Sequence, residues 1–124
     1  PRPTLIVMQC EGDQSQEVWG VRSSVENGAH YFTLRIQNDG STEATNLAGP
    51  TPVDRGRWSG ELADGRFNWT SERRDDTFDY ASTIQGSLNL ETGEYSATLL
   101  WAPLGPNIEK HFYYYGYCRL AAAQ

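Results

Sequence analysis

The chain has 124 residues, of which 38% are hydrophobic and 21% charged, and its formal net charge is −6. This size and composition predict one folded domain over residues 1–124 and argue against a disordered chain. The negative charge argues against a nucleic-acid partner, because phosphate repels such a surface, and no apolar run is long enough to span a membrane.

Turn signals divide the chain into short segments that alternate apolar and polar residues, as β-strands do. Hairpin dipeptides occur at Asn27-Gly28, Asp39-Gly40, Asp64-Gly65 and Thr92-Gly93. No segment has helical periodicity over three turns. The pattern predicts up to nine strands, at 3–10, 16–26, 29–37, 42–48, 56–63, 66–73, 78–91, 94–102 and 110–120.

Three of these turns can be checked by pairing residues across them. In each predicted register the apolar residues of both strands fall on one face and the polar residues on the other. Gly60 and Gly86 would each lie opposite a large side chain. The predicted pairs are Leu62–Phe67, Gly60–Trp69, Trp58–Ser71 and Arg57–Glu72, then Leu90–Tyr95, Leu88–Ala97, Gly86–Leu99 and Ile84–Trp101, and finally Val21–Leu34 and Trp19–Ile36.

Consecutive hairpins predict an all-β, antiparallel fold, either an up-and-down barrel or a flattened sandwich of eight or nine strands. The two cysteines, Cys10 and Cys118, fit no metal-site spacing and lie near opposite ends of the sequence. We predict that they form one disulfide; the alternative is two separate buried thiols. A disulfide indicates an oxidising compartment, so the protein is expected to be secreted or periplasmic.

Signatures of catalysis and of cofactor or metal binding are missing from the sequence, which favours a protein that is not an enzyme and needs no cofactor or metal. The main acidic cluster is the loop with Asp75, Asp76 and Asp79. The carboxylates of this loop raise a small hydrolase as one possible function.

The last predicted strand carries the most informative pattern. Three tyrosines and two residues that can be basic alternate with a second set that belongs to the core. Tyrosine is a frequent contact residue because it is large, rigid and amphipathic. Two other interpretations remain open: the tyrosines pack against neighbouring loops, or the faces are reversed and they line the interior. The candidate partner-binding residues are His111, Tyr113, Tyr115, Tyr117 and Arg119.

The layout also resembles the small periplasmic lysozyme inhibitors, which are antiparallel barrels with a disulfide. The resemblance rests on an early strand ending in Cys10, the turn at 92–95 with Trp101 after it, and the late Cys118. It implies an inhibitor class. The lysine-bearing inhibitory loop of that family has no counterpart after Trp101, since Lys110 is the only lysine, so no functional residue is carried over.

The leading prediction is a non-enzymatic binding module that recognises a protein or glycan through the aromatic face of the last strand. The second is a carrier that holds a small apolar ligand inside the barrel. The third is the small hydrolase. Candidate pocket residues for the carrier are the four tryptophans, Trp19, Trp58, Trp69 and Trp101.

Overall fold

The computed structural model describes residues 5–18, 21–24, 28–75, 80–103 and 110–121, and the elements in these ranges are all β-strands. None of the described segments is a helix that could cross a membrane. The strands are β1 (Leu5–Val18), β2 (Val21–Ser24), β3 (His30–Gln37), β4 (Ser41–Ala48), β5 (Gly56–Ser59), β6 (Glu61–Ala63), β7 (Arg66–Asp75), β8 (Tyr80–Asn89), β9 (Glu94–Pro103) and β10 (Lys110–Leu120).

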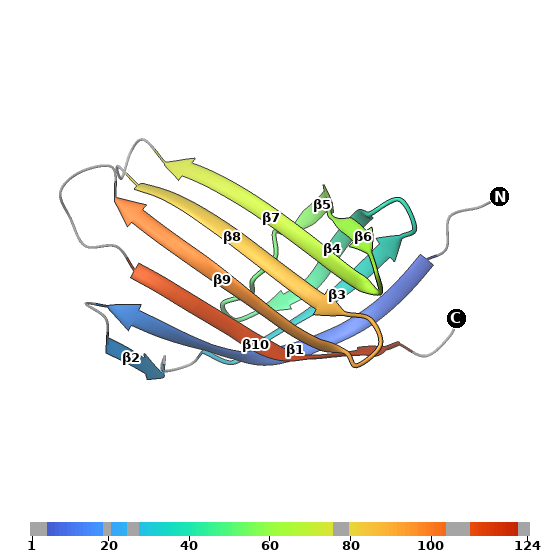
Figure 1. Ribbon diagram of the computed structural model, residues 1–124, viewed down its shortest axis with the longest axis horizontal. Helices are drawn as coiled ribbons and strands as arrows, with labels where there is room; N and C mark the ends of the chain where they lie inside the picture. The colour runs from blue at the N-terminus through green and yellow to red at the C-terminus, as the bar shows by residue number, and fades with distance from the viewer. Residues whose placement is uncertain (1–4, 19–20, 25–27, 76–79, 104–109, 122–124) are drawn as a thin grey trace.

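The strands form one antiparallel sheet that curls into a nearly closed barrel (Figure 1). Their order is β5-β4-β3-β1-β10-β9-β8-β7-β6, and β2 pairs with β1 outside this path. The two strands at the ends of the order, β5 and β6, follow each other in the chain with only Gly60 between them. The Gly60 amide donates a hydrogen bond of 2.9 Å to the Gly40 carbonyl at this seam. The prediction of an all-β antiparallel fold is therefore confirmed, and of the two predicted arrangements, barrel and flattened sandwich, the barrel is the one that forms.

Gly60 is the point at which the chain changes partner across the seam. β5 pairs with β4, whereas β6 pairs with β7. A Cβ atom on Gly60 would lie 2.4 Å from the nearest ring atoms of Phe67, so the ring fills the space that a side chain would need. The expected pairs of Gly60, Trp58 and Arg57 with β7 are wrong, because the ladder with β7 ends at Glu61.

Two of the three predicted hairpins form, one of them with a different register. Asp64 and Gly65 both have positive φ, and Leu62 lies opposite Phe67 as predicted. At the Thr92-Gly93 turn, Leu88 and not Leu90 lies opposite Tyr95. The loop is longer than two residues, and its last amide, that of Gly93, bonds the Asn89 carbonyl at 2.8 Å.

This register differs from the predicted one by two residues along the whole β8–β9 ladder. Gly86 therefore lies opposite Ala97, and Ile84 opposite Leu99. A shift by two leaves every side chain on its predicted face, which is why the pattern alone did not reveal it. The side chain that covers Gly86 is Trp69 on β7, whose ring atoms lie 2.1 Å from where a Cβ would stand.

The third hairpin prediction is wrong. The first strand does not end at Cys10: β1 continues to Val18, and β3 pairs with β1 itself, with Leu34 opposite Met8. The predicted strand 16–26 is divided between the end of β1 and the short β2. Val21 lies opposite Val18 and is exposed, and Trp19 lies outside the described residues.

Inside the barrel, a packed core occupies the half near the β3–β4, β6–β7 and β8–β9 turns. It contains Phe32, Leu34, Ile36, Phe67 and Leu88, all fully buried. The loop at 49–55, between β4 and β5, is part of this packing, since Pro52 and Val53 are buried.

Two tryptophans bind that loop through their indole nitrogens. Trp69 Nε1 donates to the Pro52 carbonyl at 2.8 Å, and Trp58 Nε1 donates to the Asp54 carbonyl at 3.0 Å. Their rings also contact each other, with centroids 6.3 Å apart. The loop therefore fills part of the barrel lumen and is fixed there by hydrogen bonds.

The predicted disulfide is confirmed, and it joins two neighbouring strands. Cys10 on β1 lies directly opposite Cys118 on β10, and the two are bonded across a sequence separation of 108 residues. Both cysteines are buried. The bond is consistent with an oxidising compartment.

Replacing Cys10 and Cys118 by alanine, or reducing the bond, should lower the free energy of unfolding by up to about 4–5 kcal/mol, because the closed loop is long. Urea unfolding followed by tryptophan fluorescence measures this loss. Reductant should have no further effect on the double variant. An unchanged midpoint after complete reduction would show that strand pairing alone holds β1 against β10.

Candidate functional site

The outer face of β10 presents the predicted tyrosine stripe to solvent. Tyr115 is 52% exposed and Tyr117 is 63% exposed. Tyr113 and His111 are partly buried on the same face, and Arg119 is exposed at its end. We call these five residues of β10 the tyrosine surface.

The alternating residues of β10 point into the barrel. Tyr114 and Cys118 are buried, and Phe112 packs against the core. Leu120 belongs to the same alternating set, which was predicted to face the core, but it is exposed because it lies at the end of the strand. The assignment of the two faces is otherwise as predicted, and the interpretation in which the tyrosines line the interior is wrong.

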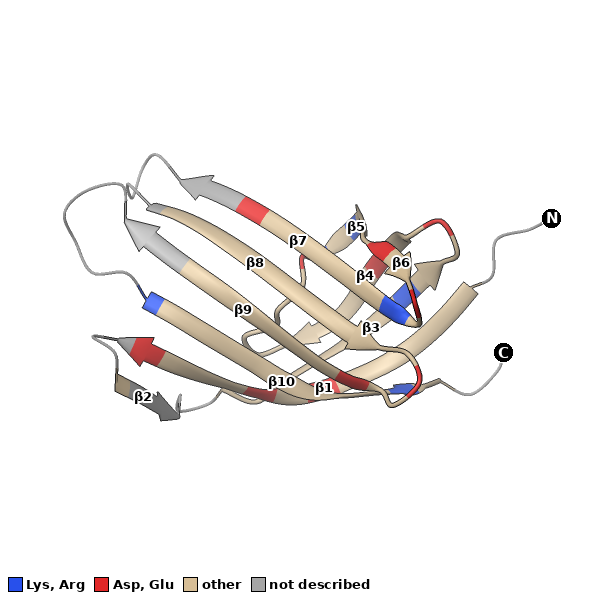
Figure 2. Ribbon diagram, viewed as in Figure 1, with Lys and Arg blue, Asp and Glu red and all other residues tan. Residues whose placement is uncertain are grey.

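Carboxylates from both neighbouring strands flank the tyrosine surface. On β1, Glu11 lies opposite Tyr117 and Asp13 lies opposite Tyr115. On β9, Glu94 lies on the other side of Tyr117. All three acidic residues are exposed, and Figure 2 shows acidic segments along β1 and at the start of β9 beside β10. Sequence reasoning missed this arrangement because it ended the first strand at Cys10.

One tyrosine of the surface is bound to a further carboxylate. The Tyr113 hydroxyl donates a hydrogen bond of 3.2 Å to Glu17 Oε2 on β1. Glu17 lies opposite His111 in the ladder. This end of the stripe is therefore held by side chains of its own sheet, whereas Tyr115 and Tyr117 present their rings to solvent.

Beneath the tyrosine surface, a polar pair is buried in the barrel. His30 on β3 is only 4% exposed, and its Nδ1 lies 3.4 Å from the Gly28 carbonyl. Because a carbonyl only accepts, Nδ1 donates there, and Nε2 accepts from the Tyr95 hydroxyl at 2.5 Å. Both ring nitrogens are thus engaged in structural hydrogen bonds.

The Tyr95 hydroxyl occupies space that is free only because two neighbouring residues are glycines. A Cβ on Gly12 would lie 2.5 Å from this hydroxyl, and a Cβ on Gly116 would lie 2.6 Å from it. These glycines face each other across β1 and β10. Gly12 therefore makes room for a side chain, at a position that lies beyond the predicted end of the first strand. The neighbouring Tyr114 hydroxyl accepts a hydrogen bond of 2.8 Å from Gln14 Nε2.

Burial lowers the pKa of His30 below its ordinary value of 6.5. The unfolded chain therefore takes up a proton near that pH, whereas the folded chain resists it. The contribution of His30 to the free energy of unfolding is therefore fully present above pH 6.5. It is lost as the pH falls below that value, by at most about 1.4 kcal/mol per pH unit for one group.

Urea unfolding at pH 7.5 and at pH 5 should show this loss, and the His30→Gln variant should lose less over the same range. Gln preserves hydrogen-bonding capacity toward Tyr95 without a titrating ring. An equal loss in both proteins would assign the acid sensitivity to other groups.

A cavity of about 400 Å³, partly open to solvent, lies between the loop at 49–55 and strands β4, β8, β9 and β10. Its apolar lining comes from Leu47, Val53, Ile84 and Leu99, and several of these inward-facing side chains are only partly buried. Its polar lining includes Thr51, Asp54, Ser82 and Tyr114. Such a lining suits a small molecule with an apolar body and a polar end.

Of the four tryptophans predicted to line a ligand pocket, Trp58 and Trp69 do not line this cavity, and Trp58 lines instead the groove on β1, β3, β4 and β5. Trp69 and Trp58 pack against Phe67 and hold the loop at 49–55. Trp101 lies on β9 opposite Ser82, but its side chain is not among the described ones, and Trp19 lies outside the described residues altogether.

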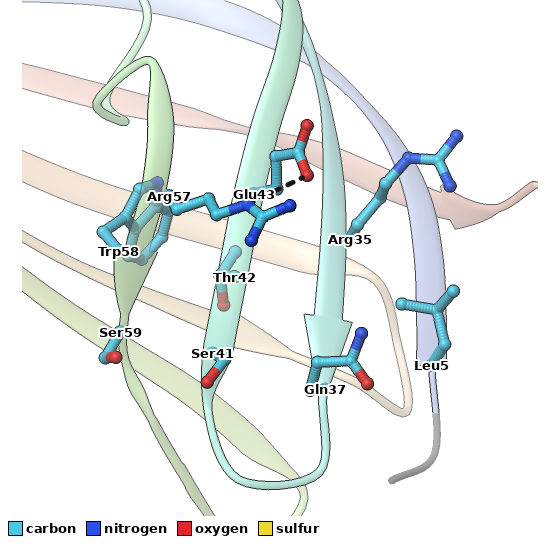
Figure 3. Close-up of a pocket in the computed structure, with 9 residues that line it drawn as sticks. All are labelled: Leu5, Arg35, Gln37, Ser41, Thr42, Glu43, Arg57, Trp58 and Ser59. Atoms are coloured by element: carbon cyan, nitrogen blue, oxygen red, sulfur yellow. Dashed lines mark ion pairs between the residues drawn. The ribbon is translucent and has the colours of Figure 1, made fainter.

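A groove of about 560 Å³ also lies on strands β1, β3, β4 and β5 (Figure 3). One cross-strand row in it consists of Arg35, Glu43 and Arg57, in register on three neighbouring strands. Arg57 Nε lies 3.8 Å from Glu43 Oε2, and both side chains are well exposed. Charge of opposite sign to that beside β10 therefore occurs on a different part of the sheet.

Among the described residues, no group of three His, Cys, Asp or Glu side chains is placed to hold a metal ion. Asp76 and Asp79 of the acidic loop lie outside these residues, and so does Glu109 near His111. No protein-family model matches the chain, and no curated protein matches it. The geometry of the chain itself is thus the basis for the function proposed below.

Proposed function

We propose that the protein is a non-enzymatic, secreted or periplasmic binding module that recognises a protein or glycan through the tyrosine surface. The observation that carries the proposal is the exposure of Tyr115 and Tyr117, at 52% and 63%, on a strand whose other face is core. Tyrosine loses little conformational entropy on contact and offers both a ring and a hydroxyl to a partner.

The rigidity of β10 supports this role. The strand pairs with β1 from Leu120 to Lys110 and with β9 from Tyr117 to Lys110. Tyr114 and the disulfide at Cys118 anchor its inner face. A surface that is ordered before binding pays less entropy when a partner docks. The disulfide also supports the secreted or periplasmic location, because such bonds persist there.

Replacing Tyr115 by alanine should weaken partner binding at least tenfold and lower the free energy of unfolding by about 1 kcal/mol or less, since about half of the side chain is already exposed. A photoreactive phenylalanine analogue at position 115 identifies the partner in the native host, and the variant is then tested against it by calorimetry.

The matched control places the same photoreactive group at Gln85, an exposed position on β8. Position 115 should form a specific adduct that position 85 does not. Identical adducts from both positions, or full partner affinity in the Tyr115→Ala variant, would contradict the proposal. A large loss of stability would assign Tyr115 a structural role.

The cavity beside the loop at 49–55 supports a second proposed function, the carriage of a small ligand that has an apolar body and a polar end. Its volume falls in the range of small-molecule sites, and Ile84 and Leu99 face it without being fully buried. Apolar side chains that face an interior and yet stay accessible gain burial when a ligand covers them.

Native mass spectrometry of protein recovered from its host should then show an adduct that denaturation removes. Leu99→Phe should reduce the bound fraction several-fold by filling the cavity, whereas Leu100→Phe, at the next position on the outer face, should leave it unchanged. A bare native ion, or equal occupancy in both variants, would count against a carrier.

A further inference from the structure

We infer that the partner of the tyrosine surface is a cationic protein segment, rich in lysine or arginine. The inference rests on the proposed function and specifies the chemistry of its partner. It comes from the register of neighbouring strands, which places exposed carboxylates on both sides of an exposed tyrosine. Across β9, β10, β1 and β3 one row is Glu94, Tyr117, Glu11 and Tyr31.

The next exposed row repeats the arrangement. Ser96 on β9, Tyr115 on β10 and Asp13 on β1 lie side by side. Directly opposed residues in an antiparallel pair have Cβ atoms about 4.5–5.5 Å apart. Each of the two most exposed rings therefore has at least one carboxylate on a neighbouring strand, at a distance that one ligand group can bridge.

A lysine ammonium or an arginine guanidinium satisfies both groups at once. Such a cation is attracted to the face of an aromatic ring within about 6 Å of its centroid, and it forms a charge-assisted hydrogen bond to a carboxylate. Arginine can in addition stack its flat group on a tyrosine ring. Neither an anionic glycan nor a phosphate-bearing polymer gains this combination, since Glu11, Asp13 and Glu94 repel it.

The charges on this face support a partner of positive charge. Glu11, Asp13, Glu17 and Glu94 lie in the strands beside β10, and the tyrosine surface itself contributes Arg119 and His111 only at its two ends. The central part, around Tyr115 and Tyr117, is therefore anionic and aromatic. The whole chain has the same sign, with a net charge of −6, which favours encounter with cationic partners over long distances.

The test uses the full chain and two acetylated, amidated peptides, one of alternating glycine and lysine and one of alternating glycine and glutamate. Amide chemical shifts of the labelled protein are followed by NMR at low salt, where weak binding is measurable. The lysine peptide should shift residues 11–15, 94–98 and 113–119, with an affinity that falls as salt is added. The glutamate peptide should shift none of them.

Two triple variants that remove the same number of charges distinguish specific binding at the tyrosine surface from nonspecific electrostatic attraction. Glu11→Gln with Asp13→Asn and Glu94→Gln removes the flanking carboxylates. Glu61→Gln with Asp64→Asn and Glu91→Gln removes three exposed carboxylates elsewhere. The first should weaken lysine-peptide binding about tenfold, because exposed ion pairs contribute modestly but add up, and the second by less than about twofold. Tyr115→Leu with Tyr117→Leu should also weaken it severalfold.

The outcomes separate this inference from the proposed function. Equal weakening by both triple variants, or no effect of the tyrosine variant, would reduce the lysine-peptide result to nonspecific charge and overturn the inference. If the lysine peptide fails to bind while Tyr115→Ala still loses the crosslinked partner, the surface is a binding site for another chemistry. If Tyr115→Ala keeps that partner as well, both proposals fall.

Discussion

The pairing of β1 with β10 is the constraint on which the rest of the molecule depends. It joins strands from opposite ends of the described chain, places Cys10 against Cys118, and completes the sheet on the side opposite the Gly60 seam. It also places β10 between β1 and β9, and so brings carboxylates from distant parts of the sequence beside the tyrosines. The closure of the barrel and the arrangement of the candidate site thus both follow from the pairing of β1 with β10.

Glycines opposite aromatic rings decide how the barrel is filled. Gly60 accommodates Phe67, Gly86 accommodates Trp69, and the pair Gly12 and Gly116 accommodates the Tyr95 hydroxyl. In each case the missing side chain lets a large ring lie close to the backbone of the neighbouring strand. The loop at 49–55 then occupies part of the remaining lumen, next to the cavity beside β8 and β9.

Local patterns in the sequence were sufficient for the fold class, the disulfide, the Asp64-Gly65 hairpin and the two faces of β10, because each depends on alternation or on turn chemistry. They were insufficient where the role of a residue depends on a contact with a residue far away in the sequence. Gly12 resembles a turn residue, yet its role is to admit the Tyr95 hydroxyl from β9. Because the predicted first strand ended at Cys10, Glu11 and Asp13 were never placed beside Tyr117 and Tyr115. Of the tryptophans assigned to a pocket, Trp58 and Trp69 bond a loop that no pattern places inside the barrel, and Trp58 also lines the groove on β1, β3, β4 and β5.

The buried polar pair explains why the tyrosine surface can be both aromatic and rigid. The exposed rings of β10 bury little surface, so the strand is anchored by its two ladders and by its inner face. On β10 that anchoring comes from Tyr114, bonded to Gln14, from the disulfide, and from Gly116, against which the Tyr95–His30 pair packs. Polar groups buried and satisfied in this way fix one arrangement of the strands, since any slip would leave a hydrogen-bonding group without a partner. The inner face of β10 therefore fixes the spacing between ring and carboxylate that the outer face presents.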